Sequence, residues 1–211
     1  MARPKSSGLP KAVEEQLRLT QLLDIAAEVF FEVGYEAAST AEIAARAHSS
    51  KRALYSRFSS KEELFLAVID HRTSKIADRV TELFQEERPI RPLLLDVARE
   101  LLRSLLSDEH TALIRLVYAQ APQFPQAAEF MTERGPDRGI AKIAAHLKEQ
   151  ARRGTLSISD SQLAAQQFAG LLVGDLIHQA LLRLDVPRSQ KAMEARAQSA
   201  VEAFLKIYGA A

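Results

Sequence analysis

The stretch STAEIAARAHSSKRALYSRF, residues 39–58, decides the fold. Ser39 and Glu42 have the spacing of a capping box, in which the Ser39 hydroxyl accepts from the third helical N–H and Glu42 reaches back to the cap. The short helix that they open runs into residues 47–50, a four-residue hinge, after which a serine can cap a second short helix. Together with the helix before them, these elements predict a helix-turn-helix packing over residues 13–58.

Apolar and polar residues of this region separate onto two faces. The expected core of the three helices consists of Ile25, Val29, Phe30, Ile43, Ala44, Leu54 and Phe58. The outer face of the third helix carries Lys51, Arg52, Ala53, Ser56 and Arg57. Such a short, basic face suits entry into a DNA major groove, which is about 12 Å wide. Periodicity alone also fits a three-helix packing module that binds no DNA.

Basic residues without acids are concentrated at one end of an almost neutral chain. Residues 76–211 carry 17 basic and 17 acidic side chains, which sum to zero. Residues 43–61 contain no acid and hold Arg46, Lys51, Arg52, Arg57 and Lys61. Residues 1–12 add Arg3, Lys5 and Lys11, again without an acid. This pattern predicts a polyanion-binding site near the N-terminal end. The alternative is a helical protein-interaction module whose basic segment binds an acidic partner.

The other segments also show helical periodicity, and strand-like alternation is scarce. A stripe of apolar residues predicts a first helix that ends at Gly34, a residue suited to the position after a helix. Further helices are expected over residues 61–87, 94–106, 111–121, 140–153 and 161–184, with a short helix ending near Arg134, a break at Gly135-Pro136, and a last helix to Tyr208 after the separator Val186-Pro187-Arg188. We therefore expect an all-α fold of about nine or ten helices.

Composition excludes several classes of protein. The chain has 211 residues, of which 47% are hydrophobic and 26% charged, as in an ordinary globular protein. It contains no Cys, which excludes disulfides and thiolate chemistry, and its five His residues never fall at metal-ligand spacing with a carboxylate. Neither a signal-peptide h-region nor a membrane-spanning run is present. We expect a cytoplasmic protein without a membrane partner, a metal, a cofactor or an enzymatic activity.

Residues 20–70 resemble the DNA-binding region of the TetR family of bacterial transcriptional repressors. The resemblance rests on the order and spacing of Leu23-Asp24-Ile25-Ala26-Ala27, Phe30, Val33-Gly34-Tyr35-Glu36-Ala37, Ser39, Glu42-Ile43-Ala44, Ala47, Ser50-Lys51, Leu54-Tyr55, Phe58, Ser60-Lys61-Glu62 and Leu64-Phe65. The C-terminal part looks like the AcrR- and AefR-like branch in its helical layout. The chain departs from the family pattern at His48 and Ser49 in the turn, at Arg52 and Ala53 in the third helix, and at Ser59. The operator sequence therefore cannot be borrowed from a relative.

The resemblance implies a repressor that binds a palindromic operator in double-stranded DNA as a homodimer and is released by a small effector. It implies that residues 1–60 form the helix-turn-helix domain with a basic arm, and that residues 61–211 form the effector-binding and dimerisation domain. The implied DNA contacts are Ser39, Ser50, Lys51, Arg52, Ala53, Tyr55, Ser56, Arg57 and Lys61. Of these, Lys51, Arg52 and Ala53 would face base edges, and Ser39, Tyr55 and Lys61 would contact phosphates.

The last two expected helices carry more apolar surface than one core requires. A stripe of this width is either buried inside the protomer or shared with a partner, and in the resembling family these helices form a four-helix bundle between two copies. The resulting candidates for the dimer interface are Leu171, Leu176, Leu181, Val201, Phe204 and Leu205.

Prolines interrupt the helices between residues 89 and 154, and such irregular packing leaves room for an apolar pocket. The resemblance implies that an effector binds there. Our candidates for its wall are Phe84, Leu102, Leu113, Tyr118, Phe130, Met131, Ile143, Phe168 and Leu172. Asp175 and His178 are polar residues of an apolar helix, and they could orient a ligand or form a buried pair across a dimer. The expected effector is a small, mostly apolar molecule, either aromatic or cationic.

Overall fold

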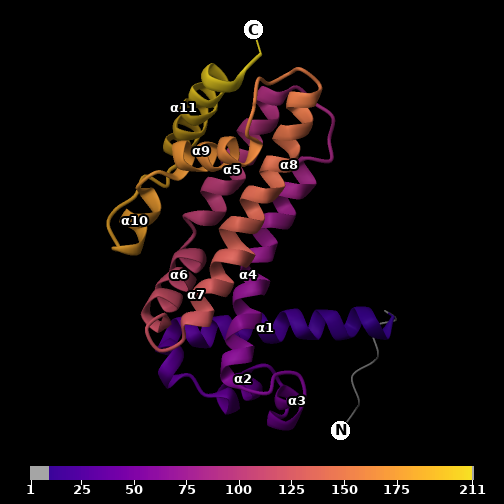
Figure 1. Cartoon of the computed structure of the whole chain (residues 1–211). Helices are drawn as coiled ribbons and strands as arrows, with labels where there is room; N and C mark the ends of the chain where they lie inside the picture. Colours follow the sequence, from indigo (N-terminus) through magenta and orange to yellow (C-terminus); the bar gives the residue numbers. More distant parts are fainter. Residues whose placement is uncertain (1–9, 211) are drawn as a thin grey trace. The chain divides into compact units, whose positions relative to one another are not determined.

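The computed structural model describes residues 10–210, and every regular element in this range is helical (Figure 1). The elements are α1 (Lys11–Ala37), α2 (Thr40–Arg46), α3 (Lys51–Tyr55), α4 (Lys61–Leu83), α5 (Ile90–Leu105), α6 (Asp108–Gln120), α7 (Pro125–Thr132), the π-helical turn η1 (Glu133–Asp137), α8 (Arg138–Arg152), α9 (Ser161–Val173), α10 (Leu176–Leu181) and α11 (Gln190–Tyr208). The expected all-α class is confirmed. None of these helices combines the length and the apolar character that a membrane crossing needs.

The chain divides into two compact units between His71 and Arg72, within α4. The first turns of α4 belong to the first unit because Leu64, Phe65 and Val68 are fully buried there. The expected domain boundary, between residues 60 and 61, coincides with the start of α4, whereas the observed division lies eleven residues later, inside that helix. Since α4 continues into the second unit, one helix is common to both.

Three aromatic rings pack together between α1 and α4 in the first unit. Phe30 of α1 meets Phe65 of α4 edge to face, with ring centroids 5.2 Å apart, and Tyr35 lies 4.9 Å from the Phe65 ring. Such edge-to-face contacts are a favoured geometry for buried aromatic pairs. Ile43 of α2 and Leu54 of α3 are also fully buried. Six of the seven predicted core residues of the helix-turn-helix are therefore buried, and Ile25 is half-buried.

Gly34 ends the regular part of α1. Its backbone has φ 80° and ψ 166°, a conformation in which an L side chain is strained. The chain then turns through Tyr35 toward α2, and the Ala38 N–H donates to the Gly34 carbonyl at 3.2 Å. The predicted helix stop is confirmed at this residue.

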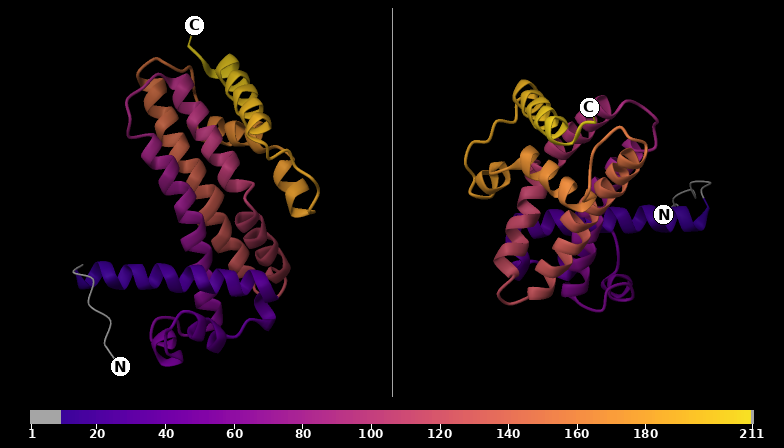
Figure 2. Two further views of the ribbon diagram at one scale, coloured as in Figure 1. Left: turned by 180° about the vertical axis from the view of Figure 1, so that it is seen from behind. Right: turned by 45° about the horizontal axis from the view of Figure 1, so that its top comes forward.

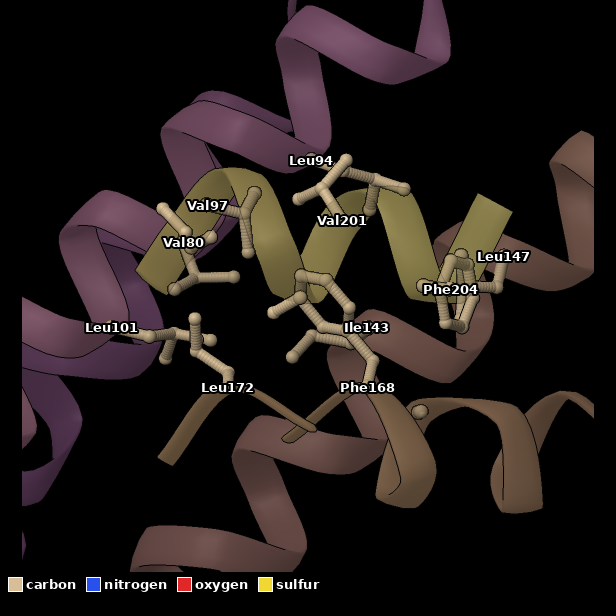
Figure 3. Packing of buried hydrophobic residues seen from close by; sticks show 14 of the residues in the cluster. Val80, Leu94, Val97, Leu101, Ile143, Leu147, Phe168, Leu172, Val201 and Phe204 are labelled. Atoms are coloured by element: carbon tan, nitrogen blue, oxygen red, sulfur yellow. The ribbon is translucent and has the colours of Figure 1, made fainter. Parts of the chain in front are cut away.

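The core of the second unit lies among α5, α8, α9 and α11. Phe168 of α9 and Phe204 of α11 meet edge to face at 5.2 Å and are surrounded by aliphatic side chains, including Leu94 of α5 and Leu147 of α8 (Figure 3). Within this unit, Figure 2 shows α11 beside α5 and α9, which agrees with their contacts. Arg99 of α5 donates two hydrogen bonds of 2.7 Å to Glu194 of α11 and closes the outer edge of this packing.

Two predicted helix boundaries in this unit are wrong. The helix expected over residues 161–184 is interrupted at Gly174, which has φ 45° and ψ −122°, so α9 and α10 are separate. Conversely, Gly135-Pro136 does not break the chain out of helical structure. Pro136 has no N–H to donate, and the wider turn η1 accommodates it and leads directly into α8.

The candidates for a dimer interface differ in their burial. Val201 and Phe204 are completely buried within one protomer, where they fill the core between α5, α9 and α11, so they are not available to a partner. Leu171, Leu176, Leu181 and Leu205 are partly exposed. The large apolar side chains that are well exposed in this region are Leu163, Leu182, Leu184 and Ile207.

Gly34 has a left-handed backbone and Gly170 a helical one, so alanine substitutions at these two glycines form a matched pair of variants. Gly34→Ala is expected to lower the free energy of unfolding by about 1–3 kcal/mol, because alanine is strained at the backbone angles of residue 34. Gly170→Ala should raise it by about 0.5–1 kcal/mol, because Gly170 lies within α9 and an added Cβ meets nothing within 4 Å. Chemical denaturation measures both, and a shift of the same sign in the two variants would contradict the assignment.

Candidate functional site

Serine caps begin both helices of the helix-turn-helix. The Ser39 hydroxyl accepts from the Ala41 N–H at 3.2 Å, and the Ser50 hydroxyl accepts from the Ala53 N–H at 3.0 Å. The cap at Ser39 is confirmed, but Glu42 does not complete the predicted box, because its carboxylate pairs with Arg46 at 2.7 Å. Asparagine, aspartate and serine are the side chains that best satisfy free N–H groups at such positions.

The turn between α2 and α3 requires a left-handed residue, and His48 supplies it with φ 50°. The His48 N–H donates to the Ala45 carbonyl and the Ser49 N–H donates to the Ala44 carbonyl, which is the bonding pattern of a Schellman helix end. Glycine is the usual residue at this position because it has no Cβ. His48 therefore has a structural role in the turn, at a conformational cost.

The exposed face of α3 presents two basic side chains. Leu54 points into the core, whereas Lys51, Arg52 and Ala53 are exposed on the other side. The Lys51 ammonium lies 5.8 Å from the centroid of the Tyr55 ring. Within residues 10–71, the Arg52 guanidinium makes no side-chain hydrogen bond or ion pair. These two cations are thus available to an outside partner.

Tyr55 connects α3 to the beginning of α2. Its hydroxyl is hydrogen-bonded to that of Thr40 at 3.0 Å, while 41% of the residue surface is exposed. Thr40 itself is buried and follows the cap residue Ser39. The hydroxyls of Ser39, Thr40 and Tyr55 therefore belong to one side of the helix-turn-helix.

The other basic residues of the acid-free segment are bonded inside the first unit. Arg46 pairs with Glu32 of α1 and with Glu42, each at 2.7 Å, and Arg57 pairs with Glu15 of α1 at 2.6 Å. Ser56 donates to the Ala53 carbonyl at 2.8 Å. The basic run is therefore continuous in sequence, but in the fold α1 provides acids opposite part of it.

Lys61 closes the end of α1. Its ammonium donates to the carbonyls of Tyr35, Glu36 and Ala38 at 2.9–3.4 Å and lies 4.5 Å from the centroid of the Tyr35 ring. A lysine that donates three hydrogen bonds in this way positions α4 against α1. A phosphate contact by Lys61 stays a prediction. Of the predicted basic arm, Arg3 and Lys5 lie outside the described residues, and Lys11 is exposed at the start of α1.

A largely apolar cavity of about 280 Å³ lies within the second unit. Helices α4 to α10 and the turn η1 all contribute to its wall. The wall consists of Thr73, Ile76, Ala77, Val80, Leu101, Leu105, His110, Ile114, Tyr118, Met131, Thr132, Gly135, Pro136, Gly139, Ile140, Ile143, Ala169, Leu172, Val173 and Ile177. Twelve of these twenty residues lie in the interval 89–154, where a pocket is expected, and the other eight come from α4, α9 and α10.

The candidate pocket residues do not all lie at this wall. Four of them line the cavity: Tyr118, Met131, Ile143 and Leu172. Three others are fully buried in core positions that do not line it: Leu102, Leu113 and Phe168. The ring of Phe84 stacks on His146 at 4.3 Å, and Phe130 lies under the Arg134 guanidinium. Asp175 accepts a hydrogen bond from Gln179, and His178 is exposed.

Sequence reasoning missed the small residues of the wall and its histidine. We selected large side chains, but a large side chain fills space, and the cavity exists where Ala77, Gly135, Gly139 and Ala169 leave space open. The spacing of Gly135 and Gly139, one helical turn apart, is the signal that could have identified this wall. His110 could not be distinguished from the other histidines by spacing.

His110 is a half-buried ionisable group of the cavity wall. Its backbone N–H donates to the Ser107 hydroxyl that caps α6, and its ring lies among apolar side chains. Burial lowers the pKa of this imidazole to about 4, because the charged form loses its hydration. The ring is therefore neutral near pH 7.

A second hollow of about 330 Å³ lies between α6 and the segment after α10, and it differs in character. Three of its charged side chains make bonds within the protein: Arg188 pairs with Asp108, and Arg115 donates to the Ala180 carbonyl at 3.2 Å. Its wall is therefore polar, unlike that of the apolar cavity. Within residues 10–210, no three His, Asp or Glu side chains are grouped in a way that could hold a metal ion.

Two family models match this chain. The model described as "Bacterial regulatory proteins, tetR family" matches residues 22–68, and the model described as "AefR-like transcriptional repressor, C-terminal domain" matches residues 92–210, more than half of the chain. The helix-turn-helix and most of the cavity wall lie within the matched segments.

Individual relatives agree with these matches. The HTH-type transcriptional activator FasR of Mycolicibacterium smegmatis is 48% identical over 65 residues, which is 31% of this chain and 30% of FasR. The chain aligns with less than half the length of three of the curated relatives that it matches.

Solved structures cover more of the chain. A putative TetR-family regulator of Mesorhizobium loti has a TM-score of 0.86 and 29% identity, with 95% of this chain and all of that chain covered. The flavonoid-responsive regulator FrrA has a TM-score of 0.71 and 27% identity, with 92% and 98% covered.

The half-buried histidine predicts a pH dependence of stability. In the unfolded chain an imidazole with an ordinary pKa of about 6.5 takes up a proton as the pH falls, whereas His110 in the folded protein stays neutral until about pH 4. Its contribution to stability is complete above about pH 6.5 and is lost as the pH falls below it. Between about pH 7.5 and pH 5 we expect His110 to account for about 2 kcal/mol of lost unfolding free energy.

This prediction is tested by chemical denaturation of His110→Gln at the two pH values. The variant should lose about 2 kcal/mol less than the wild-type chain over this interval. His178→Gln, which replaces an exposed histidine of the same unit, is the control. Equal losses in the wild-type chain and in His110→Gln would show that His110 does not titrate as its burial implies.

Proposed function

Because the chain belongs to the TetR family of bacterial transcriptional regulators, we propose that it is a repressor that binds a palindromic DNA operator as a homodimer. In this proposal a small, mostly apolar effector binds in the cavity of the second unit and releases the DNA. The protein acts in the cytoplasm, where the bacterial chromosome is, and performs no catalytic step.

The observation that carries the DNA-binding proposal is the exposed side of α3. Lys51 and Arg52 project from a short capped helix whose opposite side is anchored by the buried Leu54. In a helix-turn-helix the second helix of the motif enters the major groove and presents such side chains to base edges. Arg52 would bind a guanine, because its two parallel N–H groups match the acceptors of that base.

We assign different roles to the other predicted DNA contacts. Ser39 and Tyr55, with their exposed polar groups on one side of the motif, are proposed to bind phosphates, and Ala53 is small enough to let α3 approach the base edges. Arg57 contacts DNA in this proposal only if it leaves Glu15, since that carboxylate holds it at 2.6 Å. Ser50 and Ser56 act through the geometry of α3.

The second unit supports the remaining parts of the proposal. Exposed leucines and Ile207 near α9, α10 and α11 supply apolar surface for a partner protomer. The cavity supplies a binding site, and α4 lines it with Thr73, Ile76, Ala77 and Val80. Since α4 starts in the first unit, we propose that it carries the effect of the ligand. The regulator FrrA, which has this fold, is described as flavonoid-responsive.

Arg52→Ala tests the base-reading role. We expect it to cost about 1–3 kcal/mol of binding free energy on an operator found by selection, and to relax the preference at one base pair. The measurement is competition binding with every single-base variant of the site. Arg91→Ala removes the same charge from the exposed surface of the second unit and is the control. Unchanged affinity and unchanged base preference in Arg52→Ala would refute the assignment.

Gly139→Phe tests the cavity as the effector site. Gly139 lies in α8 at the cavity wall, and a Cβ added there meets nothing within 4 Å, so we expect the ring of a phenylalanine to take up cavity space. A compound that releases the wild-type protein from DNA, applied at about 100 times its Kd, should stabilise that protein by about 2.7 kcal/mol. It should neither stabilise nor release Gly139→Phe, which keeps its affinity for DNA.

The control for this variant is Ala141→Phe, which changes an exposed residue of the same helix. It should respond to the compound as the wild-type protein does. Thermal unfolding and DNA release are measured together. A full response in Gly139→Phe would place the effector elsewhere.

A further inference from the structure

We infer that the cavity selects an uncharged ligand of about two fused rings that carries one hydrogen-bonding group, and that His110 binds this group. The inference deepens the proposed function, on which it rests for the role of the ligand, and it names the ligand class from the side chains of the wall. It departs from the cationic effector that we considered from the sequence.

The first argument is the absence of charge. None of the described residues that line the cavity is an Asp, Glu, Lys or Arg. A charged ligand would lose its hydration on entering and would meet no opposite charge, and burying an unpaired ion is strongly unfavourable. Aliphatic residues such as Ile76, Ile114 and Ile143 form most of the wall. The wall therefore disfavours both cationic and anionic ligands.

The second argument is the position of His110 among the four polar residues of the wall. Thr132 already donates its hydroxyl to the Ala128 carbonyl at 3.0 Å, and 66% of the Tyr118 surface is exposed to solvent. Thr73 is almost completely buried and has a partner within the protein. In the part of the chain that the structure describes, the ring of His110 has no hydrogen-bond partner.

A neutral imidazole offers one N–H donor and one nitrogen acceptor. His110 is kept neutral by burial, which lowers its pKa to about 4, so it can both donate to and accept from a ligand. A hydroxyl group matches this pair of capacities, whereas an ionised carboxylate can only accept and so uses one of them. One polar position in an apolar wall fixes the orientation of a ligand without requiring a second polar group.

The third argument is size. An apolar cavity of roughly 150 Å³ holds a benzene molecule. The cavity here, of about 280 Å³, is nearly twice as large, so it suits a bicyclic ring system. The naphthalene frame therefore provides probes that differ only in their substituent.

The experiment measures the binding of four such probes to the full chain by calorimetry at neutral pH. They are 2-naphthol, naphthalene, 2-naphthoate and 2-naphthyltrimethylammonium. We expect 2-naphthol to bind most tightly, and each charged probe to bind at least about tenfold more weakly. Binding of either charged probe as tightly as 2-naphthol would overturn the inference, and so would the failure of all four to bind at about 1 mM.

Variants at residue 110 test the hydrogen bond. His110→Phe keeps an aromatic ring but removes both polar atoms, so we expect about three- to tenfold weaker binding of 2-naphthol and little change for naphthalene. His110→Gln retains a donor and an acceptor and should restore the preference for 2-naphthol. An equal loss for both ligands in His110→Phe would show that the ring only packs against them.

DNA release is measured separately, which distinguishes this inference from the proposed function. If 2-naphthol binds in the predicted manner but leaves the affinity for DNA unchanged, the ligand class stands and the proposed effector role of the cavity fails. If another compound releases the DNA while the four probes do not bind, the proposed function stands and the ligand class is wrong.

Discussion

The placement of a five-residue helix is the constraint on which the molecule depends. A helix as short as α3 is unstable alone, because helix nucleation costs more than so few hydrogen bonds return. Its position comes from the buried side chain of Leu54, from the Ser50 cap and from the left-handed turn at His48. The aromatic contacts between α1 and α4 belong to the core of the same unit, in which Leu54 is fully buried. The exposed side of α3 can then be basic, with Lys51 and Arg52 making no ion pair to any of the described residues.

In both units, several charged side chains pair with other groups of the protein at the edges of the helix packing. In the first, Arg46, Arg57 and Lys61 are bonded to acids or carbonyls and hold the helices together, which leaves Lys51 and Arg52 for an outside partner. In the second, ion pairs such as Arg99–Glu194 lie at the edge of the packing, and the described residues that line the cavity carry no formal charge. The helix α4 runs through the boundary between the two units, which is why we propose it as the element that carries the effect of the ligand.

Local patterns predicted most of the helical organisation and the outer side of α3. Gly34 and the serine caps were identifiable because their effects depend on a few neighbouring residues. The pairing of Arg57 with Glu15 was not, since the two residues are brought together only by the fold. The cavity wall was predicted in part for a related reason: Ile143 and Phe168 look alike in sequence, and only the packing decides that the first faces the cavity and the second the core. Apolar periodicity predicts one continuous helix over residues 161–184, but Gly174 interrupts it because its backbone is left-handed.

Selection of binding sites from random duplex DNA by the full chain tests the central claim most directly, namely that two copies of α3 read base edges on a two-fold symmetric site. The account predicts an enriched inverted repeat whose half-site centres are about 34–36 Å, one turn of DNA, or a multiple of this distance apart. Enrichment of no sequence, or of a single half-site without its symmetric mate, would contradict it.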